Sequence, residues 1–308
     1  MGAYFLHLAI LAGIFIIVAV SLNLIIGFAG QVSLGHAAFY GIGAYVSALA
    51  AIHLHFPFPL AALAAVAGAG LCGLALGMPT LRLKEDYLAI VTLGFGVIVD
   101  QVFLNLEITG GPDGLTGIPC PSFLGWSFRD PVLYLILVLL MVGLTLGLIW
   151  RLVQSQHGRA LRAIRDHETT AQVMGINTKA YKIGVFSLAA ALTGLAGSLY
   201  AHYITFISPE SFGLHTSILV LCMVVLGGMG SLAGSVVGAV ALVLLPEGLR
   251  HLQPFFDFVF GHLGLLGRKV EVFQELIYGG LLIALLIWRP GGLMGKGKTS
   301  LKFVERKR

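Results

Sequence analysis

Long apolar segments alternate with short polar ones along nearly the whole chain. A segment needs roughly 20 mostly apolar residues to cross the hydrocarbon layer of a bilayer, which is about 30 Å thick. The pattern therefore predicts an all-α polytopic membrane protein with roughly 8–10 transmembrane helices, and we treat residues 1–308 as a single membrane domain. The apolar segments run approximately over 3–27, 30–53, 58–79, 86–107, 131–150, 183–207, 214–229, 231–250 and 273–289.

Two of these segments are unusually rich in glycine, "GFAGQVSLGHAAFYGIGAY" at 27–45 and "VLGGMGSLAGSVVGAV" at 225–240. Each glycine weakens a helix by about 1 kcal/mol relative to alanine, and a broken helix in a bilayer requires protein or a cavity around its freed backbone. Interruptions in two halves of a chain indicate a translocation pathway. The candidates are Gly30, Gln31, Ser33, Gly35, His36, Gly228, Gly230 and Ser231. Close helix packing across Gly230, Gly234 and Gly238 is the alternative.

Charge is concentrated in a short island, "GRALRAIRDHETTAQVMGINTKAYKI" at 158–183, although only 11% of the chain is charged. Two further basic clusters lie at Arg82/Lys84 and in the tail 290–308. Basic residues flanking spans collect in the cytoplasm, so we place the loop 151–182 and the tail on that side. The Gly- and Pro-rich stretch at 109–131 then forms an irregular external cap.

The island has the sequence features of a short helix. Asp166 is a candidate N-cap, and Glu168 in the first turn suits the positive end of the helix dipole. Gly175 is a candidate C-terminal stop, followed by a turn at Asn177 and Thr178. Ala171 and Met174 are three residues apart and would share a face. Such a helix can dock in a partner's groove or lie on the membrane surface, whereas a basic loop can also serve only to set the topology.

Composition excludes several other kinds of site. Three widely spaced cysteines and ten scattered histidines make a disulfide framework or a metal site unexpected. The net charge of +5 is divided among loops that flank spans, which is not the footprint of a nucleic-acid-binding surface. Gly292, Gly297, Lys298 and Thr299 match the bare phosphate-loop pattern, but they lie close to residue 308 and no ATPase domain surrounds them, so we expect the match to be a false positive.

Five stretches together resemble one family: 23–45, 162–202, 206–213, 223–239 and 286–295. In this order they resemble the second, M-type membrane permease of ABC importers for branched-chain amino acids. The resemblance implies a type II importer-like permease in the bacterial inner membrane. It also implies a homologous second permease, two ABC ATPase subunits and a periplasmic or extracellular binding protein as partners. No cofactor and no catalytic residue are expected in this chain.

The resemblance further implies that the island carries a helix that couples the permease to the ATPase subunits. The matching residues are Arg162, Arg165, Asp166, Glu168, Ala171, Met174 and Gly175. The common importer motif has two alanines after its glutamate and a glycine six residues after it. Here Thr169 and Thr170 follow Glu168, and Gly175 lies seven residues away.

Two other functions remain open at this stage. A related importer for urea or short amides would share the same architecture. An ion-coupled secondary carrier would need an ionisable residue within the membrane, and Asp100 in "VIVDQVFLNLE" is the strongest candidate. Asp100 is more readily explained as a hydrogen-bonded structural group, or as an interfacial one if the span is shifted. No convergent set of residues for a membrane-embedded enzyme is visible.

Overall fold

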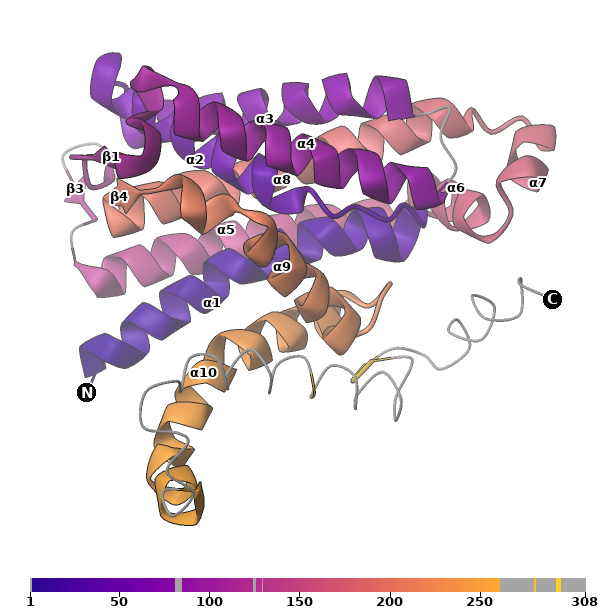
Figure 1. The fold of residues 1–308 in the computed structure, drawn as a ribbon. Helices are drawn as coiled ribbons and strands as arrows, with labels where there is room; N and C mark the ends of the chain where they lie inside the picture. The colour runs from indigo at the N-terminus through magenta and orange to yellow at the C-terminus, as the bar shows by residue number, and fades with distance from the viewer. Residues whose placement is uncertain are drawn as a thin grey trace.

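A computed structural model describes residues 2–80, 85–123, 126–128, 130–260, 280 and 292–294. The protein is a bundle of long helices with short strands at one end (Figure 1). The elements, in chain order, are α1 (Gly2–Asn23), the π-helix η1 (Leu24–Phe28), α2 (His36–His53), α3 (Phe58–Thr80), α4 (Glu85–Asn105), the 3₁₀ turns η2 (Glu107–Thr109) and η3 (Gly111–Asp113), β1 (Leu115–Thr116), β2 (Ser122–Phe123), β3 (Trp126–Ser127), α5 (Pro131–Gln154), α6 (Gln156–Asp166), α7 (Glu168–Val173), α8 (Thr178–Ile204), β4 (Phe206–Ile207), the 3₁₀ turn η4 (Pro209–Phe212), α9 (Leu214–Gly227) and α10 (Leu232–Phe260).

Six helical segments in the described residues are long and apolar enough to cross a membrane, which confirms the polytopic all-α prediction. They are Tyr4–Phe28, Phe58–Pro79, Tyr87–Asn105, Pro131–Gln154, Thr178–Ile204 and Pro209–Gly227. Helix α2 and the first part of α10 complete the bundle. The expected segment 273–289 lies outside the described residues, apart from Gly280.

Two predicted boundaries are wrong by about a turn or more. The segment expected at 30–53 becomes helical only at His36, because Gly30 has a left-handed φ of 73° that ends the preceding helix. The segment expected at 183–207 begins earlier, at Thr178, because the Asn177 side chain accepts a hydrogen bond from the Ala180 amide and caps α8.

Helix α2 lies against α3 and α8 in the core, and glycines allow the backbones to touch. A Cβ atom at Gly43 would lie 2.3 Å from the Cα of Gly194, and one at Gly197 would lie 2.1 Å from the Tyr40 carbonyl oxygen. Small residues at helix crossings permit this approach in membrane proteins. The glycines of these two helices therefore set how closely α2 and α8 pack.

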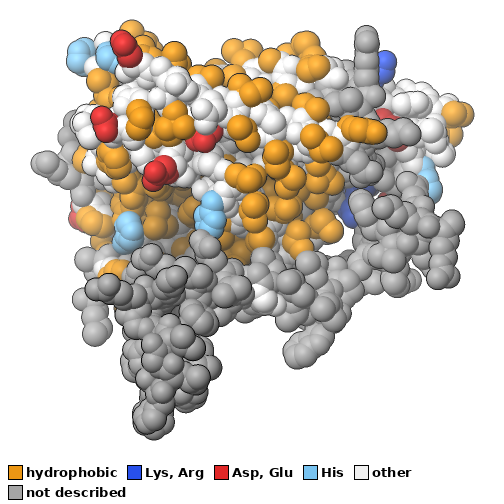
Figure 2. Space-filling model, in the orientation of Figure 1, with side chains coloured by type: hydrophobic (Ala, Val, Ile, Leu, Met, Phe, Trp, Pro, Cys, Tyr) orange, Lys and Arg blue, Asp and Glu red, His pale blue; other side chains and the backbone are white. Residues whose placement is uncertain are grey.

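The two ends of the bundle differ in character. At one end β1 pairs with β4, joining Leu115 to Ile207, and β2 pairs with β3; helices α6 and α7 lie at the opposite end (Figure 1). Hydrophobic side chains cover the middle of the face in Figure 2, whereas acidic and histidine side chains gather at the strand end and Lys and Arg appear at the other. The stretch predicted as an irregular cap therefore has short regular strands.

Candidate functional site

The charged island contains two short helices, α6 and α7, and the first residues of α8. Helix α6 begins after Ser155, whose hydroxyl accepts a hydrogen bond from the His157 amide at 3.1 Å, and it continues to Asp166. The residue that precedes α7 is His167, with extended backbone angles. The prediction that Asp166 caps the helix is therefore wrong, because α6 already includes this residue as its last one.

Gly175 ends α7 as predicted. Its φ of 83° is left-handed, its amide donates to the Gln172 carbonyl at 3.0 Å, and the Ile176 amide donates to the Ala171 carbonyl at 3.1 Å. This pair of bonds is the Schellman motif, which satisfies carbonyls at the end of a helix. Nothing lies within 4 Å of a Cβ placed on Gly175, so its requirement for glycine is conformational.

Helix α7 presents an apolar tip to solvent. Val173 is 87% exposed and Met174 is 77% exposed, whereas Ala171 is buried at 3%. The prediction that Ala171 and Met174 share a face is therefore wrong: Met174 lies beyond the last helical residue, and its backbone already departs from helical angles. Ala171 anchors α7 to the bundle, and the two residues after Gln172 form the tip.

Polar contacts fix α7 to α8, the helix that follows it. Lys182 Nζ lies 2.6 Å from Glu168 Oε1, and Gln172 Nε2 donates to Thr178 Oγ1 at 3.0 Å. Since Lys182 and Thr178 belong to α8, helix α7 is held to the start of that span. Glu168 in the first turn of α7 also has the sign that favours a helix N-terminus.

Arg162 fixes the island to the helix before it. Its Nη2 donates to the Val153 carbonyl at 2.8 Å, and its Nε donates to the Gly158 carbonyl at 3.2 Å. Val153 lies in the last turn of α5, where carbonyls lack partners within the helix and a cation is favourable. Arg162 therefore stabilises the joint between α5 and α6.

The first glycine-rich segment breaks the helix as predicted. Residues Leu24–Phe28 form a π-helix, and the Ala29 amide donates to the Leu24 carbonyl. Gly30 then turns the chain into a non-helical stretch that continues to Gly35. Here the Leu34 amide donates to Thr92 Oγ1 at 3.0 Å, so the stretch is held against α4.

The second glycine-rich segment is the turn between α9 and α10, and the side chain of Asn23 joins it to the first. Asn23 Oδ1 accepts from the Gly230 amide at 2.8 Å, and Asn23 Nδ2 donates to the Ser231 carbonyl at 2.9 Å. A Cβ at Gly27 would lie 2.3 Å from the Gly230 nitrogen. We call this cluster, made of Asn23, Gly27, Gly30, Gly230 and Ser231, the glycine junction.

Arg165 reaches the glycine junction from the island. Its Nη1 donates to the Gly27 carbonyl, and its side chain packs over Gly30. The sequence offered no indication of the Asn23 and Arg165 contacts, because they join residues far apart in the chain. The island and the two broken segments, which were predicted as separate sites, thus meet at one place.

The chain also returns to the end of α9 at residues 292–294. The amides of Leu293 and Met294 donate to the carbonyls of Leu226 and Gly227 at 2.8 and 3.0 Å. A Cβ on Gly292, whose φ is 76°, would lie 2.5 Å from the Cα of Gly228. The glycine of the bare phosphate-loop match therefore packs against the end of α9, while Gly297, Lys298 and Thr299 lie outside the described residues.

Three polar side chains of the first broken segment are buried. Within the described part of the chain, Gln31 Oε1, Ser33 Oγ and His36 Nδ1 have no hydrogen-bond partner. His36 Nε2 lies 2.6 Å from Thr193 Oγ1, which also lies within hydrogen-bond distance of the Ala189 carbonyl. Each unpaired buried group costs about 1–3 kcal/mol, so this stretch carries polar groups that packing alone does not require.

Tight backbone contacts surround Gly35, a further pathway candidate, and Gly234 and Gly238, which the packing alternative named. A Cβ at Gly35 would lie 2.0 Å from the Thr92 carbonyl oxygen. One at Gly234 would lie 2.3 Å from the Gly227 carbonyl oxygen, and one at Gly238 would lie 2.0 Å from that of Met223. These approaches between α9 and α10 support the packing interpretation for Gly234 and Gly238.

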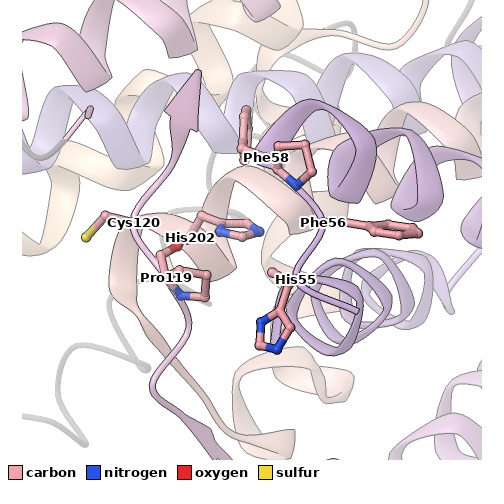
Figure 3. Close-up of a pocket in the computed structure, with 8 residues that line it drawn as sticks. His55, Phe56, Phe58, Pro119, Cys120 and His202 are labelled. Carbon is pink, nitrogen blue, oxygen red and sulfur yellow. Dashed lines mark hydrogen bonds between the residues drawn. The ribbon is translucent and has the colours of Figure 1, made fainter. Parts of the chain in front are cut away.

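A pocket of about 320 Å³ opens at the strand end of the bundle (Figure 3). His202 lines it, but its ring is engaged: Nδ1 donates to the Pro119 carbonyl at 2.8 Å, and Nε2 lies 3.0 Å from Ser47 Oγ. His55 and Cys120 line the same pocket, although the described residues contain no cluster of three groups placed to hold a metal ion. His202 therefore attaches the loop at 119–120 to α2 and α8.

The family described as "Branched-chain amino acid transport system / permease component" matches residues 4–286. The chain belongs to this family. As a permease component it is a transport subunit that spans the membrane several times, which confirms the family resemblance of the five stretches. No solved structure matches the chain.

Alignments with two curated relatives cover most of this permease. It is 38% identical over 323 residues to the high-affinity branched-chain amino acid transport system permease protein LivM of Escherichia coli strain K12, covering 96% of this chain and 71% of that protein. It is 25% identical over 300 residues to BraD of Pseudomonas aeruginosa, covering 91% of each. A shorter match, 30% identical over 151 residues, joins 47% of this permease to 43% of the autoinducer 2 import system permease protein LsrC of Photorhabdus laumondii.

Proposed function

We propose that this permease is one of two homologous membrane subunits of a bacterial inner-membrane ABC importer for branched-chain amino acids. Two ABC ATPase subunits bind at the island end, which faces the cytoplasm. A binding protein delivers the substrate to the strand end. The nucleotide binds to the ATPase subunits, and this chain holds no cofactor. The relatives named for branched-chain amino acid transport support the choice of substrate.

The observation that carries the proposal is the apolar tip of α7. Val173 and Met174 expose large hydrophobic side chains on a helix that is otherwise fixed to the bundle by Ala171 and Glu168. Exposed apolar groups on a rigid support are typical of a docking element that inserts into a partner's groove. The basic side chains of the island favour a cytoplasmic position for this tip.

In this proposal ATP acts on the permease through the ATPase subunits, which lie beyond the membrane-spanning helices. When ATP closes the two ATPase subunits, the bound α7 moves, and the contacts of α6 and α7 carry the movement to α5 and α8. The two permease subunits thereby alternate between outward-facing and inward-facing states. The buried polar groups of Gln31, Ser33 and His36 support a role for the first broken segment in lining the pathway.

Affinity purification of the permease from its native membrane, followed by mass spectrometry, tests the proposed assembly. We expect an ATPase pair and a second permease to co-purify. Proteoliposomes that contain this complex and its binding protein should accumulate labelled leucine, isoleucine or valine in preference to urea or short amides. Recovery of the permease alone or only with copies of itself would contradict the proposal.

Asp100 provides the test of the rival ion-coupled mechanism. It lies in α4 five residues before the helix ends at Asn105, about 7–8 Å from the strand end of that helix. We expect Asp100→Asn to leave ATP-driven uptake within about twofold of the wild type, because a partly exposed group near a helix end contributes little. Uptake assays at equal amounts of folded protein measure this, and loss of uptake would instead favour ion coupling.

A further inference from the structure

We infer that Arg165 is the contact through which the island moves the glycine junction. This inference rests on the proposed function, since it assigns a route to the movement that the ATPase subunits impose on α7. Arg165 is thus a positioning residue inside the permease, and its side chain is not part of the surface that binds the ATPase.

The contacts of Arg165 run inward. Its Nη1 donates to the Gly27 carbonyl and lies 3.1 Å from where a Cβ on Gly230 would be. A Cβ on Gly30 would lie 3.0 Å from Arg165 Cγ and 3.4 Å from its Cα. The partly buried side chain therefore contacts both broken segments, the end of η1 and the turn after α9.

The electrostatics explain why a guanidinium occupies this position. The helical segment that begins with α1 ends at Phe28, and α9 ends at Gly227, so two C-terminal helix ends face the same place. Terminal carbonyls have no partner within their helix, and together they carry partial negative charge. A guanidinium offers five donors and a permanent positive charge, so Arg165 stabilises the first of these ends by donating to the Gly27 carbonyl.

The sequence separation of this contact distinguishes it from the other polar contacts of the island. Arg162 binds the end of α5, and Glu168 and Gln172 bind the start of α8, so these bonds hold the island to the helices that directly adjoin it. Arg165 and Gly27 are 138 positions apart. Movement of α6 therefore reaches η1 and the α9–α10 turn through the Arg165 side chain.

The glycines of the junction are required for this contact. Gly30 and Gly230 both have left-handed φ angles, of 73° and 82°, which disfavour other residues. Any side chain there would also press on Arg165. Asn23 completes the unit, because it holds Gly230 and Ser231 and so makes the α9–α10 turn follow the end of α1.

The test measures how much substrate is transported for each ATP hydrolysed. Arg165→Met, Arg165→Lys and the control Arg159→Met are purified with their ATPase subunits and binding protein and reconstituted in proteoliposomes. Arg159 is exposed on the same helix, so R159M removes the same charge without touching the junction. We expect R165M to lower the transport-to-ATPase ratio about tenfold or more, because it removes a hydrogen bond from a charged group. R165K should restore part of the ratio, and R159M should leave it unchanged.

Each outcome decides the question. A residue that only stabilises the fold would lower uptake and ATP hydrolysis together, so an unchanged ratio in R165M overturns the inference. If R165M does not assemble, the ratio in R165K decides, and a wild-type value overturns the inference in the same way. Failure of the wild-type permease to recruit any ATPase would refute the proposed function itself. The experiment therefore distinguishes a wrong proposed function from a wrong role for Arg165.

Discussion

Replacing the apolar tip of α7 with carboxylates, as Val173→Asp and Met174→Asp together, is expected to abolish ATP-driven uptake by preventing the ATPase subunits from binding. Both side chains are mostly exposed in the permease alone, so the substitutions should not disturb its fold. Burial of a side chain of this size contributes about 1.5–3 kcal/mol. Loss of both therefore weakens binding by about a hundredfold or more.

The measurement is the amount of ATPase subunit recovered with the affinity-purified double variant, together with its uptake in proteoliposomes. Val173→Ile and Met174→Leu form a matched control, because they keep the apolar surface and should retain the complex. Recovery of normal ATPase amounts with the aspartate variant would show that another surface carries the contact. The island would then serve mainly to orient the spans in the membrane.

Gly197→Ala is expected to destabilise the permease strongly although it adds one methyl group. The new Cβ would lie 2.1 Å from the Tyr40 carbonyl oxygen and 2.7 Å from the Ala44 nitrogen, and backbone atoms of α2 cannot rotate away as a side chain could. We expect a loss of about 3 kcal/mol in the free energy of unfolding, the upper end of the usual range for overpacking.

Gly184→Ala on the same helix serves as a control, because it should leave the free energy of unfolding unchanged or raise it. No atom lies within 4 Å of a Cβ at Gly184, so the higher helix propensity of alanine should be neutral or stabilising by up to about 1 kcal/mol. Thermal unfolding of both variants in detergent, followed by tryptophan fluorescence, measures the difference. A melting temperature for G197A equal to that of G184A would show that α2 can shift away from α8 without cost.

The positions of the spans and of their interruptions were predictable because they depend on local composition. Apolar length placed α1, α3, α4 and α5 within a few residues, and glycine density located both breaks. Gly175 was predictable for the same reason, since a helix end of this kind needs a left-handed residue at one position.

The contacts that unite the site were not predictable, because they depend on tertiary structure. Nothing near Arg165 in the sequence indicates that it binds the Gly27 carbonyl, and nothing near Asn23 points to Gly230. The interpretation of Asp166 failed because α6 begins at a cap on Ser155 and extends further than the local pattern suggested. Helical periodicity likewise misplaced Met174, which lies where the helix has already ended.

The return of residues 292–294 to the end of α9 bears on the order in which the protein is made. During synthesis, the turn that contains Gly228 leaves the ribosome long before Leu293 and Met294, which supply the donors for the last carbonyls of α9. Until then these carbonyls depend on water for hydrogen bonds. A chain that stops before residue 292 thus lacks these two donors at the end of α9.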